Sequence, residues 1–240
     1  MIFLRVFGEY DLSTQLKEQD VEITIEGKGK RKSYYRKVGE EEVKKFIHAE
    51  EGKVVICPVE PVNLPKEGVA EHLLIELDKP FIIESGFKDT FYVKFPVEIG
   101  VFLVDKKDVE RIDIFTKTKP KYTLYGPPEN GIICKWWKSD VYSEMPEVDR
   151  LYEGIMKIEI ANNYYEWMEI NKVVFRAFDM KLFYNEHAYM HATLTILKRT
   201  FGETTFNKRK PKNMHGAIDI YLAKGIKKFE KKFIMELGFK

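Results

Sequence analysis

The sequence predicts a mainly β protein made of antiparallel β-sandwiches, and three observations indicate this fold class. Short stretches in which apolar and polar residues alternate recur along most of the chain. Turn-forming residues separate these stretches, and helical spacing of apolar residues is rare. Many short strands with frequent turns are typical of a sandwich or barrel rather than of βαβ units. We therefore expect two packed β-sandwich domains.

The individual strands follow from local patterns. Alternation predicts strands at residues 21–25, 91–95, 156–160, 178–182 and 190–196, where every second side chain is apolar. Continuous apolar or β-branched runs predict further strands at residues 53–61, 72–77, 80–83, 99–104 and 112–115.

Two segments carry a helical signal. Residues 40–49 place Val43, Phe46 and Ile47 at helical spacing behind an acidic first turn, although a polar strand end is the alternative. Residues 226–239 fit a helical stripe and a strand face equally well, and the strand-rich context favours a strand over residues 233–239.

A charged segment at residues 105–121 separates two strand-rich halves. We place a domain boundary there, which gives an N-terminal β domain at residues 1–118 and a C-terminal β domain at residues 119–240.

Composition limits the function classes. The 40 basic and 38 acidic residues give a net charge of +2, so no global basic field attracts nucleic acid or an anionic membrane. Two cysteines are too few for a disulfide framework, and we expect a cytoplasmic protein without a membrane span. Abundant Lys and Glu with only two glutamines fit a thermophilic source.

The most distinctive segment is LYGPPENGIICKWWKS at residues 124–139. Its Asn130-Gly131 pair predicts a type I′ hairpin turn, followed by a strand at residues 132–138. Alternation puts Ile132, Cys134 and Trp136 on a core face. It leaves Trp137, Lys135 and Ser139 as candidate ligand-binding residues, with Trp137 as a stacking platform for a sugar or base. The alternative is that both tryptophans only pack.

This segment, FGEYDL at residues 7–12 and CPVEPVNLP at residues 57–65 resemble an archaeal family, domain of unknown function 432. The resemblance covers most of the chain. It implies an archaeal, cytoplasmic origin and one family-wide fold, and it supplies no catalytic residues.

The sequence presents no catalytic set. In a strand, His187 and His191 would lie about 13 Å apart, so they could not chelate one metal ion, and we expect no metal and no cofactor. Cys134 would need a neighbouring base to act as a nucleophile, and a buried structural thiol is the simpler interpretation. Phosphate-binding and Rossmann motifs are absent from the sequence.

A basic stretch at residues 28–37 interleaves cations with tyrosines, a composition that suits single-stranded nucleic acid. Its candidate residues are Lys30, Arg31, Lys32, Tyr34, Tyr35 and Arg36. The alternative, which the balanced net charge favours, is a solvated hairpin in a Lys-rich protein.

Together these observations favour a non-enzymatic binding or interaction module that uses exposed aromatic side chains on a β-sandwich face. We expect a protein or glycan partner ahead of nucleic acid. Pairing of edge strands would also allow a homo-oligomer. The alternative class is a hydrolase with acidic residues and a histidine in an interdomain cleft.

Overall fold

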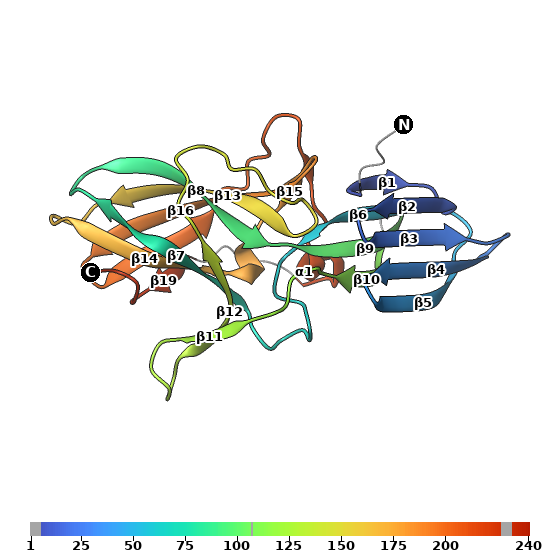
Figure 1. Ribbon diagram of the computed structural model, residues 1–240, viewed down its shortest axis with the longest axis horizontal. Helices are drawn as coiled ribbons and strands as arrows, with labels where there is room; N and C mark the ends of the chain where they lie inside the picture. The colour runs from blue at the N-terminus through green and yellow to red at the C-terminus, as the bar shows by residue number, and fades with distance from the viewer. Residues whose placement is uncertain (1–5, 107, 227–231) are drawn as a thin grey trace.

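A computed structural model describes residues 6–106, 108–226 and 232–240 of the chain. Strands make up nearly all of its regular structure (Figure 1), which confirms the mainly β fold with packed antiparallel sheets. The described helical elements are the 3₁₀ turn η1 (Ala177–Asp179) and the single-turn helix α1 (Ile220–Ala223). No helix within these residues is long and apolar enough to cross a membrane.

Two sheets form the end of the molecule that holds the first strands (Figure 1). One is an antiparallel meander of β2 (Thr14–Glu18), β3 (Val21–Glu26), β4 (Arg31–Val38) and β5 (Glu41–His48). The other has the order β1 (Gly8–Tyr10), β6 (Lys53–Val59), β9 (Glu98–Asp105) and β10 (Asp108–Phe115). The Arg36 guanidinium lies 5.1 Å from the centre of the Phe115 ring, so β4 packs against β10.

Two more sheets form the rest of the molecule. The first has the order β11 (Tyr122–Tyr125), β12 (Ile132–Ser139), β7 (His72–Ile83) and β14 (Met168–Arg176). The second has the order β18 (His215–Gly216), β15 (Phe183–Tyr184), β16 (Ala188–Lys198), β13 (Glu153–Asn162) and β8 (Lys88–Pro96), and β17 (Phe201–Phe206) joins β16 to β19 (Phe233–Met235). The β7–β12 and β13–β16 pairs are parallel, which alternation alone does not predict.

The chain crosses between the two N-terminal sheets and the other two sheets at the junction of β8 and β9. β8 and β9 follow each other with only Val97 between them, yet β8 pairs with β13 and β9 pairs with β6. β7, although early in the sequence, pairs with β12 and β14. Strand pairing therefore crosses the expected boundary at residue 118, and the division into two domains stays a prediction. Most of the buried apolar side chains form one continuous cluster from β2–β5 to β16, and Ile155, Phe183 and Tyr189 form a second, small cluster.

The expected helix at residues 40–49 is wrong, because this segment is β5, which hydrogen-bonds along β4 in full register. Its alternation turns Val43 and Ile47 inward and leaves Phe46 94% exposed. The preference for a strand near the C-terminus is confirmed for β19, whereas Phe229 lies outside the described residues.

The predicted type I′ turn at Asn130-Gly131 is also wrong. Tyr125 pairs with Ile132, so the loop has six residues, 126–131. Its end is closed by a hydrogen bond of 2.7 Å from the Gly131 amide to the Pro127 carbonyl. The adjacent prolines 127 and 128 limit the backbone angles there, and a two-residue turn does not form. The strand expected after the turn is confirmed as β12.

Candidate functional site

The predicted ligand-binding residues Trp137, Lys135 and Ser139 lie together in β12 but do not form an exposed surface. Lys135 is only 1% exposed, and the Ser139 hydroxyl accepts from the Lys94 amide at 2.8 Å. The half-buried Trp137 ring lies 6.1 Å from the Tyr152 ring. The expected exposure of Lys135 and Ser139 is wrong, because these side chains point from β12 toward Glu98 of β9 and Lys94 of β8, which cover them. A ligand-binding role for Trp137 stays a prediction.

The expected core face of β12 is confirmed fully for Cys134 and in part for Ile132 and Trp136, which pack against the core cluster. Cys134 is buried, whereas Ile132 and Trp136 are half-buried. The Trp136 indole N–H donates to Glu76 Oε2 at 2.8 Å. Trp136 is thus partly exposed, and its side chain hydrogen-bonds to the neighbouring strand β7.

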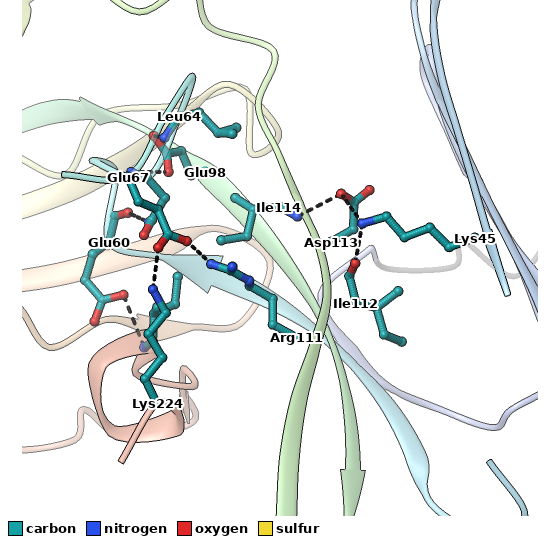
Figure 2. A network of polar contacts seen from close by, with 12 residues as sticks. Lys45, Glu60, Leu64, Glu67, Glu98, Arg111, Ile112, Asp113, Ile114 and Lys224 are labelled. Atoms are coloured by element: carbon teal, nitrogen blue, oxygen red, sulfur yellow. Dashed lines mark hydrogen bonds and ion pairs between the residues drawn. The ribbon is translucent and has the colours of Figure 1, made fainter. Parts of the chain in front are cut away.

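Lys135 belongs to a polar network that links β12 to β9 through Glu98, and Figure 2 shows the contact of Glu98 with Leu64 in this network. Its Nζ lies 2.5 Å from Oε1 of Glu98, a residue of β9 that is fully buried. The Glu98 carboxylate also accepts from the amides of Asn63 at 2.9 Å and Leu64 at 3.3 Å. Part of the CPVEPVNLP segment is therefore held by a buried carboxylate, which gives it a structural role.

The candidate nucleic-acid residues divide between two faces of β4. Tyr34 and Arg36 are buried, and Oδ2 of Asp113 accepts from the Tyr34 hydroxyl at 2.9 Å and from Arg36 Nε at 2.7 Å. Burial raises the pKa of Tyr34 well above its usual value. Tyr34 and Arg36 are therefore not accessible to nucleic acid, because their side chains point to the buried face of β4.

The other candidates of this stretch remain accessible, but acidic residues accompany them. Lys30 Nζ lies 2.7 Å from Glu50 Oε2. The Tyr35 ring is covered by Lys44, whose Nζ lies 5.3 Å from the ring centre. This face is therefore of mixed charge, and nucleic-acid binding through it stays a prediction.

His187, His191 and Cys134, the residues considered for a metal site or a nucleophile, lie on different elements of the fold. His187 lies in the turn before β16, and His191 lies within β16 with Nε2 3.1 Å from Glu159 Oε1. The same carboxylate oxygen lies 2.8 Å from Lys157 Nζ. Within residues 6–106, 108–226 and 232–240, no group of three His, Cys, Asp or Glu side chains could hold a metal ion.

Both thiols are expected to resist modification in the folded protein. Burial raises the pKa of Cys57 and of Cys134 to about 12, so neither forms the reactive thiolate at neutral pH. Titration with a chromogenic disulfide reagent at pH 8 should detect almost no thiol in the native protein and two per chain in denaturant. Rapid reaction of one native thiol would contradict this.

Large apolar side chains, three of them aromatic, are instead exposed at the turns that join β7 to β8 and β13 to β14 and at the adjacent end of β7. Tyr165 is 75%, Trp167 62%, Ile82 60% and Phe87 59% exposed. We call these four residues the aromatic end. Both turns lie at the end of the molecule farthest from β2–β5 (Figure 1).

The aromatic end is held rigidly by one buried side chain, Asn162. Its amide group donates to the Glu166 carbonyl at 2.8 Å and to the Glu84 carbonyl at 3.2 Å, while its Oδ1 accepts from the Tyr164 amide at 3.0 Å. Its backbone amide donates to the Phe87 carbonyl at 3.0 Å. Asn162 thereby ties the two turns into one unit.

Sequence reasoning chose Trp137 as the candidate ligand-binding tryptophan and did not single out Trp167, which is 62% exposed. The available signal was the position of residues 164–167, YYEW, directly after two asparagines and between two alternating strands. Asparagine favours turns, and loops run over the protein surface. Aromatic side chains clustered in a turn are thus better candidates for contact than those within a strand.

The fold and the aromatic end define an all-β protein that presents a fixed, exposed apolar surface. The chain belongs to the family DUF432, described as protein of unknown function, whose sequence profile matches residues 6–236. Comparisons with curated proteins and with solved structures give no match.

Proposed function

We propose that this protein is a non-enzymatic interaction module that binds a partner protein through the aromatic end. The observation that carries the proposal is the exposure of four large apolar side chains, Phe87, Tyr165 and Trp167 on two adjoining turns and Ile82 near the end of β7. Contiguous exposed apolar surface on a water-soluble protein is a mark of an interaction site.

The residue types fit a protein interface. Tryptophan and tyrosine are the side chains that most often dominate binding energy, because they bury large areas with few rotatable bonds. Asn162 adds preorganisation, since the turns that carry Phe87, Tyr165 and Trp167 are already fixed by its hydrogen bonds. A surface fixed before binding loses less conformational entropy when the partner docks.

The placement of apolar residues at this end also follows the alternation of the strands. Met168 and Ile83 are paired and buried, so the flanking Trp167 and Ile82 point to the outer side of the same sheet. Met168 and Ile83 thus already occupy the inner side of the sheet next to the turns. The exposed side chains of Trp167 and Ile82 do not contribute to the core.

A test is site-specific photocrosslinking in extract of the cells that make the protein, with a photoreactive phenylalanine analogue at position 165. The crosslinked partner is then purified and its affinity measured by calorimetry. We expect Trp167→Ser and Tyr165→Ser each to weaken binding at least about tenfold.

The matched control is Phe46→Ser, because Phe46 is a highly exposed aromatic residue of β5, far from the two turns. It should leave the affinity unchanged. If the aromatic-end variants bind the purified partner as well as the native protein does, the proposal is wrong.

A further inference from the structure

The meander sheet ends in an edge strand, β5, whose outer side has no strand partner among residues 6–106, 108–226 and 232–240. Figure 1 shows β5 as the outermost strand of this sheet. An edge strand presents unpaired backbone N–H and C=O groups, and these can pair with a strand of another chain. The free edge of β5 is therefore a surface to which a second chain can add.

The register of β5 shows which backbone groups lie on this free edge. The Ala49 amide donates to the Lys30 carbonyl at 2.8 Å, in the same register as the pairs between β4 and β5. Hydrogen-bonded and non-hydrogen-bonded pairs alternate along an antiparallel ladder, so residues 41, 43, 45 and 47 bond to β4. The N–H and C=O groups of residues 42, 44 and 46 therefore point outward from the edge of the sheet.

Charge selects the register in which a second copy of β5 can pair with this edge. A two-fold axis places one residue of β5 opposite itself and every other residue opposite one on the same face of the sheet. Placing Glu41, Glu42, Lys44 or Lys45 on the axis sets that charge opposite its own copy. Like charges directly opposite each other destabilise a strand pair, so these four registers are unfavourable.

The register with Val43 on the axis brings opposite charges together instead. Glu42 of each copy then lies opposite Lys44 of the other on one face of the sheet, and Glu41 lies opposite Lys45 on the other face. The Glu42 and Lys44 side chains are 43% and 74% exposed, so both are accessible to a second chain. Residues 42 and 44 also carry the outward-pointing backbone groups, so they form the hydrogen-bonded pairs of this register.

The contacts of Glu42 within one chain leave its carboxylate open to a further cation. Its Oε1 lies 3.6 Å from Lys37 Nζ, and its Oε2 lies 3.8 Å from Lys44 Nζ. Both contacts are long for an ion pair and lie on an exposed face. Exposed pairs of this kind contribute little, so exchanging them for a contact with the second copy costs little.

We propose that two copies of this chain associate by antiparallel pairing of β5 with β5 about a two-fold axis at Val43, which joins the two four-stranded meanders into one continuous sheet. Phe46, 94% exposed in the single chain, then lies opposite Glu40 in the β4–β5 turn of the second copy. This surface lies at the end of the molecule opposite the aromatic end (Figure 1), so the proposal does not rest on the function proposed above.

The test is sedimentation equilibrium of the full chain at concentrations up to about 1 mM, at which an association of millimolar affinity is half formed. We expect a reversible dimer. Glu42→Lys creates two like-charged pairs in the interface and should weaken the dimer at least about tenfold. Combining Glu42→Lys with Lys44→Glu restores opposite charges in the same register and should restore the affinity, a rescue that poor folding of the single variant cannot explain.

Oxidative crosslinking reports the register directly. Val43→Cys sets two thiols opposite each other in a non-hydrogen-bonded pair, where the Cα atoms lie about 4.5 Å apart and a disulfide can form. The matched control is Lys44→Cys, whose two copies are diagonal neighbours about 7–8 Å apart. It should crosslink much less, although position 44 is the more exposed of the two. The native Cys57 and Cys134 are buried and do not contribute.

Three results would overturn the proposal. The first is a chain that stays monomeric up to about 1 mM. The second is a dimer that Glu42→Lys leaves as tight as the native one, and the third is crosslinking of Lys44→Cys as fast as that of Val43→Cys. A dimer that Trp167→Ser dissociates and Glu42→Lys does not would place the contact at the aromatic end and would also contradict pairing through β5.

Discussion

Glu98→Ala is expected to lower the free energy of unfolding by about 3–5 kcal/mol, the usual cost of removing one partner of a buried ion pair. The substitution leaves Lys135, only 1% exposed, without its counter-ion. It also removes the acceptor of the Asn63 and Leu64 amides. Urea denaturation followed by circular dichroism measures the loss.

A matched control is Lys138→Ala, because Lys138 lies on β12 like Lys135 and forms an exposed ion pair with Asp78 of β7. Exposed pairs contribute about 0–1 kcal/mol, so this variant should unfold near the native midpoint. The double variant Glu98→Leu with Lys135→Met should lose less than Glu98→Ala, since no buried charge remains unpaired. Equal losses in Glu98→Ala and Lys138→Ala would refute the argument.

Asp113→Ala is expected to produce a second loss of about 3–5 kcal/mol, for the same physical reason at a buried pair on the neighbouring strand β10. Asp113 accepts from Arg36 Nε at 2.7 Å and from the Tyr34 hydroxyl at 2.9 Å, and both partners are buried. Without it the Arg36 guanidinium keeps its contacts with the Phe115 ring and with Glu41, whose side chain is exposed. Thermal unfolding should show the shift.

Asp113→Asn separates charge from hydrogen bonding at this site. The amide oxygen can still accept from Tyr34, so Asp113→Asn should lose less stability than Asp113→Ala. A further control is Glu41→Ala, which removes only the partly exposed partner of Arg36 and should cost about 1 kcal/mol or less. An Asp113→Ala protein as stable as the native one would contradict the prediction.

Alternation predicted much of the fold because the sheets have one buried and one more exposed face. In β3, Val21, Ile23 and Ile25 are buried while the residues between them are not, as the sequence indicates. The helix predicted for residues 40–49 was wrong because both a helix and a strand can place Val43 and Ile47 on one face. Pairing with β4 decides between the two structures. Local spacing holds no information about that pairing.

The sites were harder to predict than the strands. Lys135 and Arg36 look like surface cations in the sequence, and only the fold brings Glu98 and Asp113 to them from 37 and 77 residues away. The aromatic end likewise depends on two turns that the chain separates widely and Asn162 joins. Short-range patterns identify which side chains are apolar or charged, but not which distant group will cover them.

The passage of β8 into β9 has a consequence for the newly synthesised chain. The strands of both N-terminal sheets have all been made by residue 115, the end of β10. β7 and β8 are made before then, but their partners β12, β13 and β14 span residues 132–176. At about 5–20 residues per second, two apolar strands leave the ribosome seconds before anything can pair with them. The two N-terminal sheets can thus form during translation, before the strands that complete the other two sheets have been synthesised.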